Sequence, residues 1–266
     1  MNGEFNMEII PVDQITLLAL FAVGLVAGTI DAIAGGGGLL TLPALLATGI
    51  PPVQAIATAK LQSTAGTCSA AICYFRKGPF DFKPLLLALP CTLLGSVSGA
   101  LWLNYVDPQL IKGLLPLIFV LVGGYFLLSP QVGDIDRHQR ISPRVFAVLV
   151  GTTIGFYDGF LGPGTGTFLT AGFIALLGYN LRRATAATKV LNLTSNFAAL
   201  GLFIYGDQVI WSYGVTMAAG QVIGGGIGAR LALRSGTRLI RPLVVTICVV
   251  MILKVWGPGF LQHIIL

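Results

Sequence analysis

The chain has 266 residues, of which 55% are hydrophobic and only 10% are charged, with a net charge of +6 and a mean hydropathy of +0.86. Soluble domains carry about 25% charged residues, so this composition excludes an ordinary soluble domain and indicates a protein embedded in lipid. The basic residues are dispersed and do not alternate with aromatic residues, which argues against a nucleic-acid-binding surface.

Ten segments are predicted in chain order, five in each half of the sequence. The first half gives 12–34, 39–49, 52–75, 83–105 and 109–128. The second half gives 144–161, 166–178, 181–204, 208–232 and 239–256. The N-terminus is acidic and lacks the basic residues of a secretory signal, so the first segment is predicted to be a retained transmembrane helix. The expected fold is an all-α polytopic membrane protein with about eight to ten transmembrane segments.

The two halves repeat one pattern of residues. The stretch "GLVAGTIDAIAGGGG" aligns with "GTTIGFYDGFLGPGTG", so that Asp31 matches Asp158. The stretch "AIATAKLQSTAG" aligns with "ATAATKVLNLTS", so that Lys60 matches Lys189. A repeat with an odd number of crossings predicts that the second half is inverted in the membrane relative to the first.

The repeat divides the chain into three parts. We expect a first repeat at 12–128, a cytoplasmic linker at 129–143 and a second repeat at 144–256. Most lysines and arginines then fall in loops on one side of the membrane, which the positive-inside rule assigns to the cytoplasm. Both termini are therefore predicted to be periplasmic.

Each half contains one segment that is too short to cross the membrane as a helix. Eleven residues from Leu39 make about 16 Å of helix, whereas the hydrocarbon core is about 30 Å thick. Glycine stretches at 35–38 and 162–166 precede these short segments. Glycine lets backbone N–H groups approach a ligand, and a helix N-terminus favours an anion. The alternative to a ligand site is a break in the helix that only permits close helix packing. The absence of a P-loop motif argues against nucleotide binding.

Two lysines are expected at membrane depth, where a charged group needs a partner or water. One interpretation is a pair of structural ion pairs, Asp31 with Lys60 and Asp158 with Lys189. The other is that the lysines attract an anion while an aspartate takes part in coupling through protonation. The polar residues that follow each lysine, which line a cavity or bridge helices, are Gln62, Ser63, Thr64 and Thr67, and Asn192, Thr194, Ser195 and Asn196.

No residue pattern indicates an enzyme, a cofactor or a metal site. The cysteines Cys68, Cys73, Cys91 and Cys248 fall in apolar runs without metal-ligand spacing. His138 and His263 have no metal-binding neighbours in sequence. No arrangement of a nucleophile with a base is found, so we expect a protein without catalytic activity.

Five stretches, "IDAIAGGGGLLTLPAL", "AKLQS", "GFYDGFLGPGTG", "ATKVLNLTSN" and "LIRP", together resemble the sulfite exporter TauE/SafE family over about residues 12–256. The resemblance implies an inner-membrane permease with duplicated halves that exports sulfite, sulfonates or related small anions. The family often has Asn just before the first lysine, where this chain has Ala59. The substrate-binding positions that the resemblance and the residues suggest are Gly35, Gly36, Gly37, Gly38, Lys60, Gly162, Gly164, Lys189, Asn192 and Asn196, with Asp31 and Asp158 as coupling or ion-pair residues.

The function expected from the sequence is a secondary transporter that exports a small anion, with proton coupling, by rocking one half against the other. A passive anion channel and a membrane scaffold or subunit without transport activity are the alternatives. The expected partners are a small anionic substrate and the lipid bilayer, and no nucleic acid. The sequence leaves open whether the protein forms a homodimer.

Overall fold

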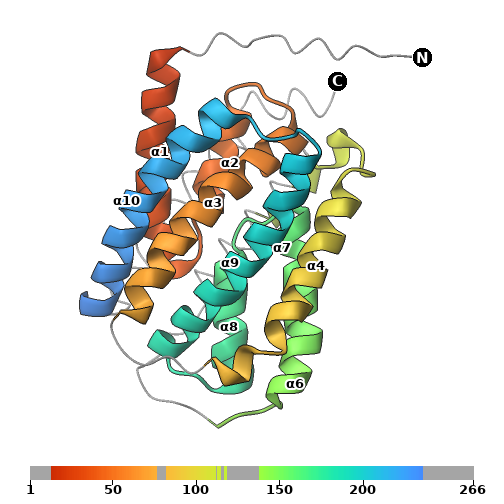
Figure 1. Ribbon diagram of the computed structural model, residues 1–266, viewed down its shortest axis with the longest axis vertical. Coiled ribbons are helices and arrows are strands. Elements are labelled where there is room, and N and C mark those ends of the chain that lie inside the picture. Colours follow the sequence, from red (N-terminus) through yellow and green to blue (C-terminus); the bar gives the residue numbers. More distant parts are fainter. Residues whose placement is uncertain (1–12, 77–81, 112, 115–116, 119–137, 236–266) are drawn as a thin grey trace.

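The computed structural model describes residues 13–76, 82–111, 113–114, 117–118 and 138–235, and all regular structure in these ranges is helical (Figure 1). The expected all-α class is therefore confirmed for this part of the chain. Most of the segment expected at 109–128, the linker residues 129–137 and the segment expected at 239–256 lie outside the described residues, as do both termini.

The helices agree closely with the predicted segments. The first half of the sequence forms α1 (Gln14–Ala34), α2 (Gly38–Leu46), α3 (Pro52–Phe75), the 3-10 turn η1 (Lys83–Leu85) and α4 (Ala88–Leu103). The second half forms α6 (Pro143–Phe146), the π-helical turn η2 (Ala147–Gly151), α7 (Thr152–Phe160), α8 (Thr165–Leu177), α9 (Leu181–Tyr205) and α10 (Trp211–Ser235). The segment predicted at 144–161 is thus one run of three consecutive helical pieces.

The outer surface of the bundle is apolar. Two helical stretches, Gln14–Ala34 and Lys83–Leu103, are long and apolar enough to cross a membrane by length and composition. Large apolar side chains are exposed on several helices, among them Leu18, Leu94, Trp102, Leu149 and Phe197. An apolar surface of this extent is unusual for a soluble monomer and is the surface that lipid requires.

Glycines bring α1 against α10. A Cβ atom added at Gly28 would lie 2.6 Å from the main-chain oxygen of Gln221, and one at Gly224 would lie 2.0 Å from that of Leu25. Side chains larger than hydrogen at these positions would push the two helices apart. Small residues at a helix crossing are the usual means by which helices pack in lipid.

The crossing of α7 with α4 repeats this arrangement at equivalent positions. A Cβ atom at Gly155, the counterpart of Gly28, would lie 2.5 Å from the main-chain oxygen of Thr92. One at Gly95, the counterpart of Gly224, would lie 2.3 Å from that of Thr152. Each crossing therefore joins a helix of one sequence half to a helix of the other.

The helices form two packing groups that do not coincide with the two sequence halves. We call them the α1 group (α1, α3 and α10) and the α7 group (α4, α7 and α9), because within each group the three helices pack along one another (Figure 1). The groups meet where α3 contacts α9. A relative motion of the sequence halves would separate α1 from α10 and α7 from α4, the two closest crossings of the bundle.

The glycine crossings should determine the stability of the fold. We expect Gly224→Ala and Gly95→Ala each to lower the free energy of unfolding by about 1–3 kcal/mol, because overpacking forces backbone shifts. Thermal unfolding in detergent, followed by the loss of monodisperse protein, measures the change.

Gly201→Ala in α9 is the matched control for these substitutions. No atom of the described residues lies within 4 Å of a Cβ atom placed there, and alanine favours a helix over glycine by about 1 kcal/mol. This variant should be as stable as the original chain or more so. Equal losses at all three positions would contradict the packing described for the two crossings.

Candidate functional site

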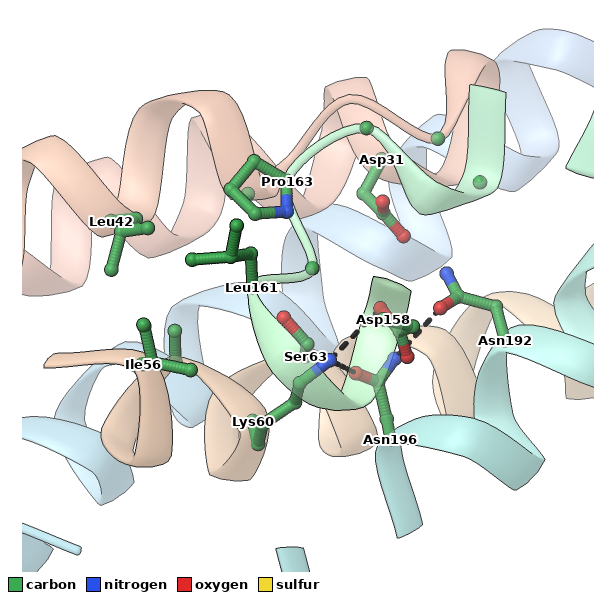
Figure 2. A pocket seen from close by; sticks show the side chains of 16 residues that line it. Asp31, Leu42, Ile56, Lys60, Ser63, Asp158, Leu161, Pro163, Asn192 and Asn196 are labelled. Atoms are coloured by element: carbon green, nitrogen blue, oxygen red, sulfur yellow. Dashed lines mark hydrogen bonds and ion pairs between the residues drawn. The ribbon is translucent and has the colours of Figure 1, made fainter. Parts of the chain in front are cut away.

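The two glycine stretches meet at the centre of the bundle. A Cβ atom at Gly35 would lie 2.3 Å from the carbonyl carbon of Gly166, and one at Gly38 would lie 3.1 Å from the Cα atom of Pro163. Figure 2 shows the loop that carries Pro163 beside the start of α2. The prediction that each stretch breaks a segment and begins a short helix is confirmed, since α2 and α8 start within or just after them.

Glycine is required in both breaks for conformational reasons. Gly35 ends α1 with φ 78°, and Gly162 and Gly164 between α7 and α8 have φ 92° and 82°. These angles lie in the left-handed region, which side chains other than hydrogen disfavour. At Gly162 a Cβ atom would also lie 2.9 Å from Nζ of Lys60, so this glycine gives the lysine its space.

The ion pairs are exchanged between the halves. Nζ of Lys60 lies 2.9 Å from Oδ1 of Asp158, and Nζ of Lys189 lies 2.8 Å from Oδ2 of Asp31. The expected pairing of Asp31 with Lys60 and of Asp158 with Lys189 is therefore wrong. Because the two glycine loops pack against each other, the last turns of α1 and α7 reach the lysine of the other half.

Lys60 is held by two side chains of the α7 group. Besides Asp158, it donates a hydrogen bond of 3.0 Å to Oδ1 of Asn196, whose Nδ2 donates one of 3.0 Å to Oδ1 of Asn192 (Figure 2). The side chains of Lys60 and Asp158 are only 4% and 2% exposed. Charges buried to this extent are stable only when they are paired and hydrogen-bonded.

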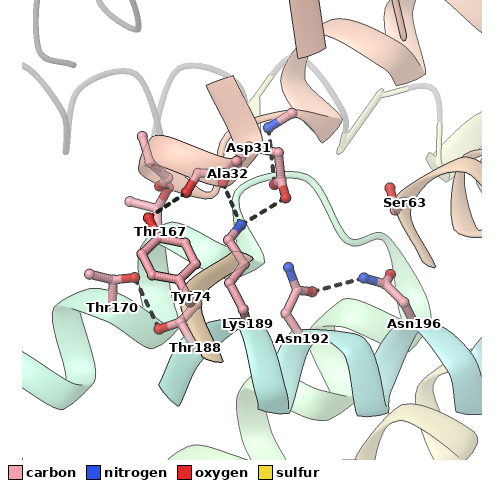
Figure 3. Close-up of polar contacts among 12 residues, drawn as sticks. Asp31, Ala32, Ser63, Tyr74, Thr167, Thr170, Thr188, Lys189, Asn192 and Asn196 are labelled. Atoms are coloured by element: carbon pink, nitrogen blue, oxygen red, sulfur yellow. Dashed lines mark hydrogen bonds and ion pairs between the residues drawn. The ribbon is translucent and has the colours of Figure 1, made fainter. Parts of the chain in front are cut away.

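Lys189 is bound instead to the end of α1. Its Nζ donates hydrogen bonds to the main-chain oxygen and to Oδ2 of Asp31, and Oδ1 of Asp31 accepts a bond of 3.4 Å from the N–H of Gly37 (Figure 3). The same helix end is held by Thr167 and Tyr74, whose hydroxyls donate to the main-chain oxygens of Ala34 and Ala32. A cation near helix C-terminal carbonyls is stabilising.

A cavity of about 30 Å³ lies between these groups. This space is sufficient to hold at least one water molecule. Many of the predicted site residues line it, namely Asp31, Gly35, Gly38, Lys60, Asp158, Gly162, Gly164, Asn192 and Asn196. Gly36, Gly37 and Lys189 are not among the described lining residues, although Gly37 and Lys189 hold Asp31, which is.

Sequence reasoning missed the apolar wall of this cavity. The wall consists of Leu42, Ile56, Ala59, Leu161 and Pro163. Ser63, already named from the sequence as a candidate cavity residue, adds a hydroxyl group. Helical spacing contains a signal for part of the wall, since Ile56 lies four residues before Lys60 and therefore shares its face of α3. Residues three or four positions away from a candidate residue on the same helix are thus candidates for the cavity lining as well.

The site is electrically neutral as a whole, because two lysines face two aspartates. Each lysine is neutralised by a carboxylate of the other packing group, so both ion pairs join the two groups.

A family model described as sulfite exporter TauE/SafE matches residues 20–255 of the chain. Named relatives are similar to it over almost their full length. A "Probable membrane transporter protein" of Haemophilus influenzae is 46% identical over 90% of this chain and 94% of its own. The "Probable membrane transporter protein YfcA" of Escherichia coli K12 is 45% identical over 96% of this chain and 94% of its own.

The similarity extends to relatives of lower identity. The "Probable membrane transporter protein YtnM" of Bacillus subtilis is 25% identical over 85% of this chain and 78% of its own. No solved structure matches the chain significantly. From the family match, which covers far more than half of the chain, and from relatives above 40% identity, it follows that this chain is a membrane protein of the sulfite exporter TauE/SafE family.

Proposed function

We propose that the protein is a secondary transporter that exports a small anion, such as sulfite, a sulfonate or a related metabolite, and that the anion binds between the two glycine loops. The observation that carries the proposal is the burial of Lys60 and Lys189 beside two broken helices that come from equivalent positions of a repeat. Broken helices at matching places in two halves are the usual setting of a transport site.

The chemistry of the site suits a small oxyanion. Lys60 lines the cavity together with Asn192 and Asn196, and two of its three N–H groups are donated to Asp158 and Asn196. The starts of α2 and α8 lie beside it and contribute the positive ends of their helix dipoles. Buried polar and ionisable groups at membrane depth are costly and are retained mainly where they carry function.

The small cavity suggests a closed form of the transporter. Opening then requires the two helical groups to move apart on one side, because the ion pairs and the bond from Lys60 to Asn196 join α3 and α1 to α7 and α9. We propose that the α1 group and the α7 group are the moving bodies, rather than the two halves of the sequence.

We further propose an inverted repeat in the inner membrane, with both termini periplasmic and the linker 129–143 cytoplasmic, between repeats at 12–128 and 144–256. The equivalent crossings at Gly28 and Gly155 support a two-fold relation between the halves. The nine residues of α2 make about 14 Å of helix, so α2 and its glycine loop form one incomplete crossing.

Transport by reconstituted protein tests the proposed function directly. We expect proteoliposomes to take up labelled sulfite or a sulfonate with saturable kinetics, because the anion must bind between Lys60 and the glycine loops before the groups move. Conduction that does not saturate would indicate a channel instead. Absence of flux under every gradient would indicate a scaffold or subunit.

The matched variant for this measurement is Lys60→Met together with Asp158→Leu. The double substitution removes both charges and leaves neither unpaired, and replacing a buried ion pair by apolar residues is often neutral for stability. It should lower transport about 10- to 100-fold, since a hydrogen bond to a charged group contributes about 1.5–3 kcal/mol. Arg230→Met, on an exposed residue of α10, removes a charge outside the site and should leave transport unchanged.

Cysteine labelling tests the membrane topology. In a background without native cysteines, Gly78→Cys should react with a membrane-impermeant maleimide only from the cytoplasmic side. Asp207→Cys, in the turn between α9 and α10, should react only from the periplasmic side. Labelling of both from the same side is incompatible with the inverted repeat.

A further inference from the structure

The two ion pairs occupy matching positions of the repeat, but the two carboxylates are not equally satisfied. Both carboxylate oxygens of Asp31 accept hydrogen bonds, one from Lys189 and one from the N–H of Gly37. The main-chain oxygen of the same residue is a further acceptor for Lys189. Asp31 is thus held at each of its oxygens by a fixed donor.

Asp158 has one oxygen without a donor. Its Oδ1 is paired with Lys60, while no hydrogen-bond partner for its Oδ2 is found in the part of the chain that the structure describes. The residue is 1% exposed and lines the cavity. Leaving a buried polar atom without a partner costs about 1–3 kcal/mol, and more for a charged group. Such an atom in a protein interior requires a reason.

The sequence of the two loops explains the difference. The first loop reads Gly35-Gly36-Gly37-Gly38, and the N–H of Gly37 turns toward Asp31. In the second loop the counterpart of Gly37 is Gly164, which keeps its N–H but has φ 82° where Gly37 has φ −56°. Pro163, which stands where the first loop has Gly36, restricts the backbone just before it. The carbonyl of Pro163 is fixed by the hydroxyl of Tyr157 at 2.5 Å. No donor of this loop satisfies Oδ2 of Asp158 among the described residues.

We propose that Oδ2 of Asp158 is the binding site of a coupling proton, and that Asp31 is a positioning residue which fixes the end of α1. This inference rests on the transport function proposed above. It distinguishes two aspartates that the repeat makes equivalent in sequence.

Protonation changes the charge of the site by one unit. A hydronium ion gives one proton to Oδ2, which leaves water and a neutral carboxylic acid, while Lys60 keeps its three protons and its charge. The pair of Lys60 and Asp158 then changes from neutral to a net charge of +1. A monovalent anion that binds to Lys60 restores neutrality, and the proton remains on Asp158 while the anion is bound.

The charged side chains around Asp158 belong to the two ion pairs. Lys60 faces it from α3, Asp31 lines the same cavity from α1, and Lys189 is bound to Asp31 from α9. The described helices α2, α4 and α8 contain no Asp, Glu, Lys, Arg or His. α7 itself adds the Tyr157 hydroxyl, and α4 adds Cys91, which lies beside Gly151, about two helical turns from Asp158. Further titratable groups on the helices that carry the lysines are Cys68, Cys73 and Tyr74 on α3 and Arg182, Arg183 and Tyr205 on α9.

Two carboxylates in one small cavity repel an incoming anion, and protonation of Asp158 removes one of them. The anion and the proton therefore move together in the same direction. Net flux follows the sum of the two gradients, so export requires an outward anion gradient larger than the opposing proton gradient.

The inference predicts proton movement that accompanies anion movement. In proteoliposomes that contain a pH-sensitive dye, an inward gradient of methanesulfonate should acidify the lumen. Methanesulfonate does not titrate near neutral pH, so the proton cannot be carried by the anion itself. Saturable uptake of methanesulfonate without acidification overturns the inference and leaves the transport function intact. If neither methanesulfonate nor sulfite shows saturable uptake, the transport function is contradicted.

The matched variants are Asp158→Asn and Asp31→Asn, which replace equivalent carboxylates by amides of the same shape. In Asp158→Asn, the remaining methanesulfonate flux should carry no protons and lose its dependence on pH. In Asp31→Asn, the ratio of protons to anions should equal that of the original protein, while the melting temperature falls. The inference is overturned if Asp158→Asn keeps the original ratio of protons to anions. It is also overturned if Asp31→Asn is the only variant that loses this ratio.

A measurement on the unaltered protein covers the case in which Asp158→Asn does not fold. Purified protein in weakly buffered detergent solution should take up protons when methanesulfonate binds, seen as a rise in pH of the solution. Binding of methanesulfonate without proton uptake contradicts the role assigned to Asp158.

Discussion

Two buried lysines are neutralised by aspartates from the opposite half of the sequence, and the rest of the structure is arranged around this requirement. Lys60 and Lys189 are buried within α3 and α9, where an unpaired charge is costly. They are stable there only because α7 and α1 end beside them. The helices α7 and α1 must therefore end close to these lysines, near Gly162 and Gly35. The left-handed φ angles of the two glycines allow the helices to end there.

The exchange of partners also links the ion pairs to the packing of the bundle. Glycine crossings hold α10 against α1 and α4 against α7, so each packing group contains helices of both halves. The ion pairs are contacts between these groups, whereas the crossings are contacts within them. In the transport mechanism proposed above, a ligand that weakens an ion pair acts on the boundary between the groups and leaves their interiors intact, as alternating access requires.

Much of the fold could be predicted from the sequence, because hydrophobic length and glycine breaks determine where membrane helices begin and end. The repeat likewise identified Asp31, Asp158, Lys60 and Lys189 as members of one site. The partners could not be predicted, since an alignment shows which residues are equivalent but not which half supplies a contact. The apolar wall and the unequal satisfaction of the two aspartates depend on side-chain positions and on single N–H donors, which only the structure places.

The exchanged pairing is tested most directly by double-mutant cycles on the free energy of unfolding in detergent. Lys60→Met is combined with Asp158→Leu in one cycle and with Asp31→Leu in the other. We expect a coupling energy of about 0.5–3 kcal/mol between Lys60 and Asp158, as for residues in direct contact, and a clearly smaller one between Lys60 and Asp31. A larger coupling between Lys60 and Asp31 would contradict the exchanged pairing.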